Sequence, residues 1–108
     1  MDPRVAAVLS LIETRPDIDV HALAVSANLS RSRLRHLFRT ETSQPLCRHL
    51  KHRRLTHAAL ALRTTFLSIK QVSAATGFRD VHHFIREFRK TFGSPPGAYR
   101  RAAISDTK

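Results

Sequence analysis

The sequence predicts an all-α fold of about seven helices, arranged as two helix-turn-helix subdomains joined by one long linker helix. Three observations support this prediction. Apolar residues recur at helical spacing through most of the chain. Residues that favour helix starts and left-handed turns separate these apolar stripes. One arrangement of cap, turn and stripe occurs twice along the chain.

Length and charge limit the possible classes of protein. A chain of 108 residues suits one compact unit or two very small ones that share a core. The formal net charge is +11, and only four of the nineteen Lys and Arg residues are lysine. A strong positive charge indicates nucleic acid or an anionic membrane surface as the partner. No segment approaches the roughly 20 apolar residues of a membrane span, so we expect no membrane partner. A single cysteine, Cys47, excludes an internal disulfide and indicates a cytoplasmic protein.

The first predicted helix begins at Pro3, because Asp2 is a suitable N-cap and proline is tolerated at the first helical position. Its apolar face ends before Pro16 and contains Val5, Val8, Leu9 and Ile12. A short helix over Val20–Ala27 follows. Asn28 then provides a residue that tolerates the left-handed turn conformation.

Ser30 caps a third predicted helix, which has an apolar and a basic face. The apolar face contains Leu34, Leu37 and Phe38. The other face carries Arg31, Ser32, Arg33, Arg35, His36 and Arg39.

Pro45 begins a long predicted helix that extends to about residue 63. Its apolar side contains Leu46, Leu50, Leu55, Ala58 and Leu62. Its basic residues are either a solvated face or phosphate contacts, and the pattern leaves both interpretations open: Arg48, Lys51, Arg53 and Arg54.

The stretch from Ser68 to Arg100 predicts the second helix-turn-helix. Ser68 and Gln71 have the spacing of a capping box at a helix start. Gly77 supplies the positive φ that ends this helix, and Asp80 is a suitable N-cap for the next one.

The helix after Asp80 has an apolar stripe of Phe84, Phe88 and Phe92, four residues apart. The residues between them are mostly basic: His82, Arg86, Arg89 and Lys90. Two helices joined by a glycine turn, with a cationic outer face on the second, are typical of a helix-turn-helix that reads DNA. Ser94-Pro95-Pro96 opens a final short helix.

The second helix of each unit repeats at a constant offset of 50, whereas the offset before the turn is 49. Ser30, Leu34, Phe38 and Arg39 recur 50 positions later as Asp80, Phe84, Phe88 and Arg89. The sequence therefore predicts a first subdomain over residues 1–44, a linker helix over 45–63 and a second subdomain over 64–108. At ~1.5 Å per residue the linker helix spans roughly 28 Å, close to the ~34 Å between successive major-groove faces of B-DNA. Two recognition helices on this linker could enter adjacent major grooves.

The residues closely resemble the signature of AraC/XylS-type bacterial transcription regulators over about residues 4 to 102. In the second half the matching residues are Ile69, Val72, Gly77-Phe78, Phe84, Arg86, Phe88-Arg89-Lys90, Phe92-Gly93, Pro96 and Tyr99-Arg100. In the first half they are Leu23-Ala24, Ser30, Leu34, Leu37-Phe38-Arg39, Glu41-Thr42, Arg54-Leu55, Ala58 and Leu62. The resemblance implies two helix-turn-helix subdomains that bind an asymmetric site as one unit.

The resemblance also implies which residues face the DNA bases. In the first subdomain they are Ser32, Arg35, His36 and Arg39, and in the second Val81, His82, Ile85, Arg86 and Arg89. Arg35 and Arg86 are candidates for bidentate contacts to guanine, with phosphate contact as the alternative. Ile85 either contacts a thymine methyl group or lies at the edge of the core.

Phosphate contacts are expected from helix N-termini and from nearby arginines. The candidates are Ser30, Arg31, Arg79 and Arg100, although isolated surface arginines need no function. The chain departs from the family pattern at Ser43, where glycine is common, so the first recognition helix is free to end differently. Ser73 and His49 replace apolar or aromatic residues, and His82-His83 replaces a small-then-aromatic pair.

Enzymatic and metal-binding functions find no support in the sequence. His49 and His52 are three positions apart, but no nearby cysteine or carboxylate completes a metal site. We find no phosphate-binding glycine loop, paired carboxylates or nucleophile–base pair. We therefore expect no catalytic residue, no metal and no cofactor.

The function expected from these observations is sequence-specific DNA binding by a bacterial transcription regulator, or by the DNA-binding module of one. Such regulators commonly carry a sensing or dimerisation domain, so the chain is either a stand-alone activator or a piece of a longer protein. Double-stranded DNA is the expected partner, RNA polymerase is a further candidate, and the isolated domain is expected to be a monomer. The alternative is a basic module that contacts the transcription machinery without reading DNA sequence.

Overall fold

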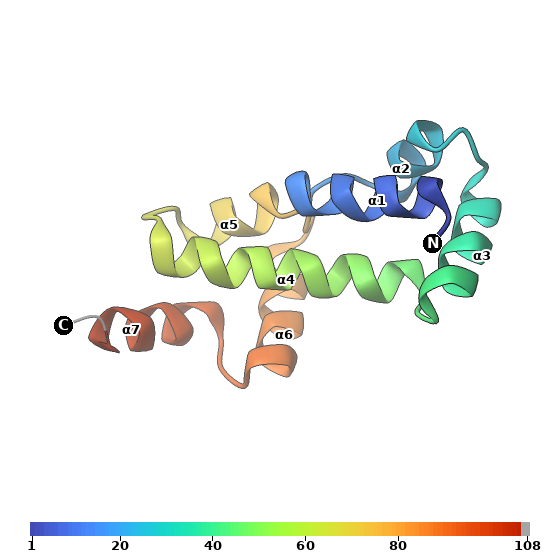
Figure 1. The fold of residues 1–108 in the computed structure, drawn as a ribbon. Coiled ribbons are helices and arrows are strands. Elements are labelled where there is room, and N and C mark those ends of the chain that lie inside the picture. The colour runs from blue at the N-terminus through green and yellow to red at the C-terminus, as the bar shows by residue number, and fades with distance from the viewer. Residues whose placement is uncertain (107–108) are drawn as a thin grey trace. The chain divides into compact units, whose positions relative to one another are not determined.

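The computed structural model describes residues 1–106, which form seven helices and no strand (Figure 1). In chain order they are α1 (Pro3–Thr14), α2 (Val20–Ser26), α3 (Arg31–Thr42), α4 (Leu46–Thr64), α5 (Ile69–Ala75), α6 (Val81–Phe92) and α7 (Pro96–Asp106). The all-α prediction is confirmed, and the helix bounds lie within a few residues of those expected. No helix within this part of the chain has the length and apolarity needed to span a membrane.

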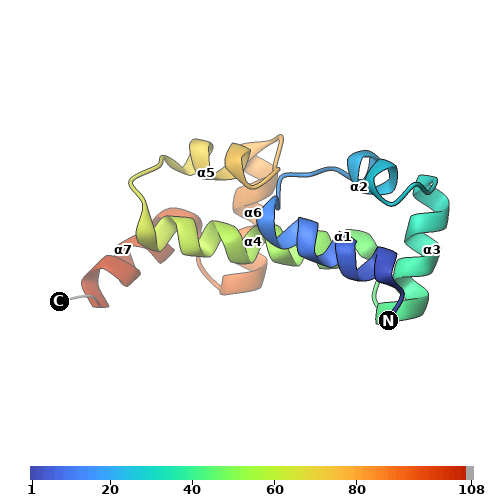
Figure 2. The ribbon, with the colours of Figure 1, turned by 45° about the horizontal axis from the view of Figure 1, so that its top comes forward.

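Contacts divide the chain into two compact units, Met1–Arg53 and a second unit that begins at Arg54. The division falls inside α4, so each unit contains part of that helix. The separate linker over 45–63 stays a prediction. In the first unit α3 runs across the direction of α1, and a short connection over residues 27–30 joins it to α2 (Figures 1 and 2).

Side-chain caps fix the helix starts of the first unit. Asp2 accepts a hydrogen bond from the backbone N–H of Arg4 at 2.8 Å, and the Ser30 hydroxyl accepts one from Arg33 at 3.1 Å. Asn28 has φ 55° in the turn between α2 and α3, as expected for a residue that tolerates the left-handed region. The recognition-helix candidate α3 therefore begins at a defined residue.

The first unit is built on an apolar cluster to which all its helices contribute. The buried members are Val5, Val8, Ile12, Ile18, Leu23, Ala24, Leu34, Phe38, Leu46 and Leu50. Leu37, expected on the inner face of α3, is only half-buried at the edge of this cluster. Burial of this many apolar side chains holds α3 against α1 and α2.

The second unit repeats the same design with an aromatic core. Ser68 and Gln71 form the expected capping box, Gly77 has φ 95°, and Asp80 accepts from the N–H of His82 at 2.9 Å. The buried residues are Leu55, Ala58, Ala59, Leu62, Val72, Phe78, Phe84 and Phe88. The rings of Phe84 and Phe88 lie 5.7 Å apart, and Tyr99 meets Phe88 edge-on at 5.2 Å. These contacts connect α6 to α7.

The two recognition-helix candidates end in the same way. Gly93 follows α6 with φ 83°, and Ser43 follows α3 with φ 62° and ψ 15°. Each donates its backbone N–H to the carbonyl four residues earlier, Arg39 or Arg89. The different ending considered for α3 does not occur, because Ser43 adopts the left-handed conformation that glycine adopts more easily.

Candidate nucleic-acid interface

The outer face of α3 carries the first predicted reading residues. Leu34 and Phe38 are fully buried and orient the helix. The four predicted reading residues lie on the exposed side: Ser32, Arg35, His36 and Arg39. The structure thus brings these side chains together on one helix surface.

The arginines of α3 are not engaged by the protein itself. Within residues 1–106, the side chains of Arg31, Arg33, Arg35 and Arg39 make no hydrogen bond or ion pair. A guanidinium has five N–H donors in a planar fork, and here all of them remain available. The face is therefore a surface of uncommitted donors suited to base edges and phosphates.

Helix α6 presents a similar but less basic face. Phe84 and Phe88 point inward and are fully buried, while His82, Arg86 and Arg89 are exposed. Arg86 and Arg89 have no hydrogen-bond or ion-pair partner within the part of the chain that the structure describes. The expected outer positions of these three residues are thus observed.

Val81 and Ile85 are placed differently from the charged residues of α6. Both are half-buried. Ile85 packs against the second core cluster, and Val81 lines a shallow hollow between α5 and α6 together with Phe78 and Arg79. Packing therefore accounts for part of the surface of both side chains, and their contact with bases stays a prediction.

The four phosphate candidates differ in whether their side chains already bond to other parts of the protein. Arg31 and Arg79 are exposed and have no protein partner among the residues that the structure describes. The Ser30 hydroxyl is occupied as the N-cap of α3. Arg100 is half-buried and donates from Nε to the carbonyl of Leu62 at 3.0 Å. Arg100 thus has an intramolecular role that the sequence pattern did not indicate.

Glu87 is a charged residue of α6 that the sequence interpretation missed. Its side chain is 11% exposed, and it forms an ion pair with Lys90 at 3.2 Å. Residues 84, 87 and 88 share one helix face, so its position three after Phe84 was the signal for burial. Its carboxylate places a negative charge on the inner side of a helix whose outer side is basic.

His49 replaces an aromatic residue of the family pattern and packs as one. Its ring centroid lies 5.4 Å from that of Phe38. Desolvation by burial, followed by the nearby Arg53 charge, lowers the pKa of His49 below its ordinary value. The structure shows no group of three metal-ligating side chains among the residues it describes.

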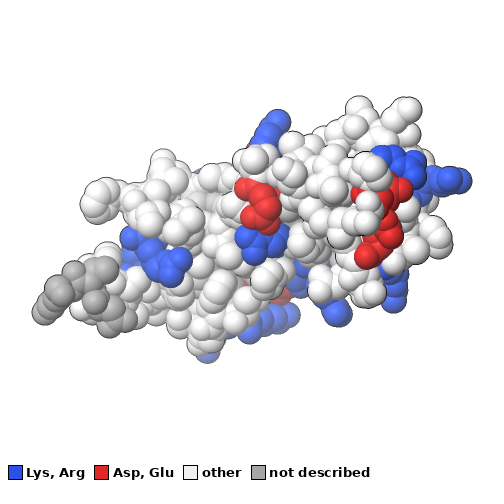
Figure 3. Space-filling view, in the orientation of Figure 1, with Lys and Arg blue, Asp and Glu red and all other residues white. Residues whose placement is uncertain are grey.

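Positive charges predominate on the surface. Figure 3 shows one face of the molecule, on which Lys and Arg side chains outnumber Asp and Glu. This excess agrees with the net charge of +11. A surface of this kind attracts polyanions before any specific contact forms.

Comparisons with known proteins identify the family. The model of a helix-turn-helix domain family matches residues 23–102. The chain is 44% identical over 85 residues to the transcriptional activator NphR of Rhodococcus, which covers 79% of this chain and 25% of that protein. The chain spans between 25% and 35% of the length of the curated relatives it matches.

Solved structures show the same fold. The DNA-binding domain of the transcriptional factor AdpA, solved in complex with a target DNA, matches with a TM-score of 0.83 and 30% identity, covering 96% of each chain. A regulator with an AraC-type DNA-binding domain from Chromobacterium violaceum matches with a TM-score of 0.78 and 26% identity, covering 94% of this chain and 92% of that one. The chain therefore belongs to the AraC-type family of helix-turn-helix domains.

Proposed function

We propose that this chain is the sequence-specific DNA-binding module of a bacterial transcription regulator, and that it inserts α3 and α6 into adjacent major grooves of an asymmetric promoter site. One observation carries the proposal. The arginines on the outer faces of α3 and α6 have no protein partner within residues 1–106, although each helix is rigidly capped and packed. Uncommitted donors on helices that are capped and packed favour an external ligand with many acceptors, and duplex DNA is such a ligand.

The comparisons support this ligand. The AdpA domain, which shares the fold, is described in complex with a target DNA, and NphR is described as a transcriptional activator. By analogy we expect this chain to act on promoters, and as an activator.

Base reading is assigned to side chains that reach beyond the helix surface. Arg35 and Arg86 each donate two hydrogen bonds to the O6 and N7 atoms of a guanine. Ser32, His36 and His82 accept or donate at neighbouring base edges, whereas Val81 and Ile85 offer methyl groups to thymine. Arg39 and Arg89 lie one turn further along their helices, where they contact bases at the end of each half-site or the adjoining backbone.

Backbone contacts position the module. Arg31 and Arg79 lie at or before the starts of α3 and α6, where exposed amides and a guanidinium together suit a phosphate. The Ser30 hydroxyl already serves as the N-cap of α3, so Ser30 supports a phosphate contact only by marking the helix start, where backbone amides are exposed. Arg100 contributes only those donors that its contact to α4 leaves uncommitted.

The competing function is a protein-interaction module that contacts the transcription machinery without reading DNA. That function would place the basic residues away from the two recognition helices, whereas α3 alone carries Arg31, Arg33, Arg35 and Arg39. Contact with RNA polymerase is compatible with DNA reading and would use other surfaces. We expect the isolated domain to be a monomer, which its mass in solution by light scattering checks.

Selection of random duplexes against the purified protein at about 150 mM salt tests the proposal. We expect two unlike half-motifs about one helical turn apart. A palindromic motif would contradict the arrangement of two readers in one chain. Recovery of no motif at all would contradict sequence-specific binding and favour the interaction module.

A further inference from the structure

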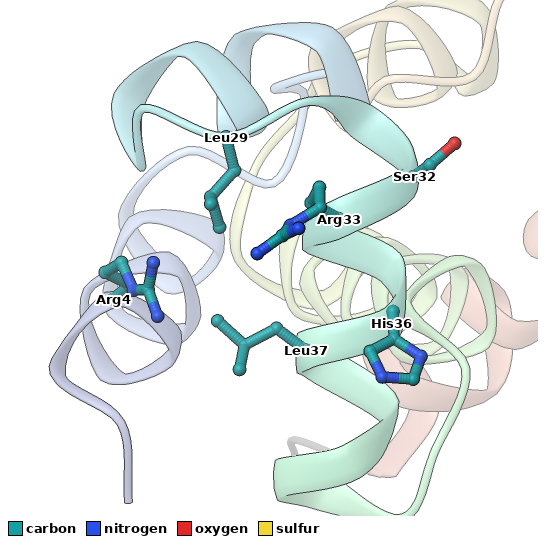
Figure 4. A pocket seen from close by; sticks show the side chains of 6 residues that line it. All are labelled: Arg4, Leu29, Ser32, Arg33, His36 and Leu37. Atoms are coloured by element: carbon teal, nitrogen blue, oxygen red, sulfur yellow. The ribbon is translucent and has the colours of Figure 1, made fainter.

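A hollow of about 390 Å³ lies beside α3 in the first unit, at the edge of the proposed base-reading face. Figure 4 shows the side chains that line it. They are Arg4, Leu29, Ser32, Arg33, His36 and Leu37. The guanidinium of Arg4 extends from α1 and that of Arg33 from α3, with Leu29 and Leu37 between them, while Ser32 lies along the outer side of α3 (Figure 4).

Arg33 brings an uncompensated positive charge to this hollow. It is exposed and makes no hydrogen bond or ion pair within residues 1–106. The adjoining Ser32 and His36 belong to the proposed base-reading face. An anion held by Arg33 would therefore lie immediately beside the groove that α3 enters.

Arg4 is held in place by Asp2. Its Nε and Nη2 atoms donate to the Asp2 carboxylate at 3.2 and 3.0 Å. Asp2 is itself fixed, because it caps α1 and its backbone N–H donates to the Glu41 carboxylate at the end of α3. Arg4 makes no further hydrogen bond within the described chain, so its Nη1 donors stay available above the hollow.

The negative charge of Asp2 limits, but does not cancel, the attraction for an anion. The hydrogen bonds from Arg4 lower the pKa of Asp2, so its carboxylate stays ionised at neutral pH. Among the described residues the Asp2 carboxylate pairs with Arg4 and does not line the hollow, so the charge of Arg33 remains uncompensated there. One guanidinium paired with Asp2 and one without a partner among the described residues therefore line the hollow together with Leu29 and Leu37.

We propose that this hollow binds a phosphate group, held between the Nη1 donors of Arg4 and the guanidinium fork of Arg33, and that in the DNA complex this group is a backbone phosphate beside the half-site read by α3. Guanidinium forks suit phosphate oxygens, and Leu29 and Leu37 suit the apolar face of an attached deoxyribose. The DNA source rests on the proposed function. Free phosphate shares the same chemistry and is the other possible source.

Salt dependence of DNA binding tests the proposal with Arg33→Gln and Arg4→Gln, and with Arg15→Gln as the matched control. Arg15 follows α1, is exposed and pairs only weakly with Asp17, at 3.9 Å. For Arg33→Gln we expect an equal loss of affinity for all duplexes and a slope of log K against log salt that is smaller by about one. Arg15→Gln should leave the slope unchanged. Circular dichroism confirms that each variant is folded.

A neutral methylphosphonate, placed in turn at each backbone position around the first half-site, locates the contact. At one position we expect it to weaken wild-type binding while adding no loss for Arg33→Gln. Unchanged slopes for Arg33→Gln and Arg4→Gln, together with no such position, would overturn the DNA contact. The salt slope is measured on any duplex and does not need a selected motif. If the duplex selection recovers no motif, the proposed base reading is contradicted, but the effect of Arg33→Gln on the slope still tests the phosphate contact.

Titration with inorganic phosphate at constant ionic strength separates the two sources. We follow the side-chain Nε resonances of Arg4 and Arg33 by NMR, with those of Arg15 as the reference. Selective shifts together with an altered DNA slope assign the hollow to backbone phosphate. Selective shifts with an unaltered slope support phosphate binding and assign it to the free ion. The absence of both effects overturns the proposal.

Discussion

The guanidinium of Arg100 donates from Nε to the backbone carbonyl of Leu62, 3.0 Å away, and so joins α7 to the end of α4. Its Nη2 reaches the carbonyl of Thr65 at 3.4 Å. Carbonyls in the last turn of a helix have no partner within the helix, and a positive charge there complements the helix dipole. Arg100, which the sequence pattern indicates as a phosphate contact, thus also caps the C-terminal end of α4.

Replacing Arg100 separates these two roles. For Arg100→Gln we expect a free energy of unfolding lower by about 1–2 kcal/mol, because two hydrogen bonds from a charged donor are weakened or lost. Urea denaturation measures this change. Arg101→Gln is the control, since Arg101 is exposed and has no partner among residues 1–105. A DNA-binding salt slope that falls by about one with unchanged stability would instead make Arg100 chiefly a phosphate contact.

Arg86 and Arg35 should affect separate parts of the target site. We expect Arg86→Ala to relax base preference within one half-motif and Arg35→Ala within the other. Each variant should lose roughly 1–3 kcal/mol of the binding free energy that separates the preferred base from the others. Repeating the duplex selection with each variant measures the change. If either variant instead weakens binding equally for every duplex, that arginine holds phosphate and reads no base.

The helices were predictable because the signals that start and end them are local. Asp2, Ser30 and Asp80 each cap the helix that follows them, and Ser68 forms its capping box with a residue only three positions away. The buried faces of α3 and α6 follow equally from helical spacing. Exposure of the proposed reading residues is the geometric consequence of those buried faces.

The sequence did not predict contacts between residues far apart in the chain. Arg100 and Leu62 are 38 positions apart, and the Asp2–Glu41 contact spans 39. Nothing in helical spacing brings such residues together, because their meeting depends on how helices pack within each unit. The hollow between Arg4 and Arg33 has the same origin. The burial of Glu87 was not predicted for a different reason, since a carboxylate on a buried helix face departs from the usual hydrophobic pattern.

The two left-handed helix ends predict opposite effects of exchanging serine and glycine. We expect Ser43→Gly to raise the free energy of unfolding by about 0.5–1 kcal/mol, because glycine relieves the strain of positive φ more than it loosens the unfolded chain. Gly93→Ser should lower it by a similar amount. A Cβ at Gly93 meets nothing within 4 Å, so strain alone is responsible there. Urea denaturation measures both changes in the free energy of unfolding. If both substitutions raised it, or both lowered it, this explanation would be contradicted.

His49 gives the first unit a stability that depends on pH. Its Nε2 atom is buried and accepts or donates no hydrogen bond within the described residues, and burial lowers the pKa of the ring below the ordinary 6.5. The charges of Arg53 and His52 add to this lowering, and that of Glu13 opposes it. Since the unfolded chain binds the proton more readily, His49 contributes stability above the unfolded pKa, and this contribution is lost as the pH falls.

His49→Phe should therefore flatten the fall in stability between about pH 7 and pH 5. Phenylalanine keeps the ring contact with Phe38 and removes the titrating group. His21→Gln is the control, because it also removes one histidine, at an exposed position at the start of α2. Thermal unfolding across this range measures the profile. A His49→Phe profile as steep as that of the unmodified protein would assign the acid sensitivity to other groups.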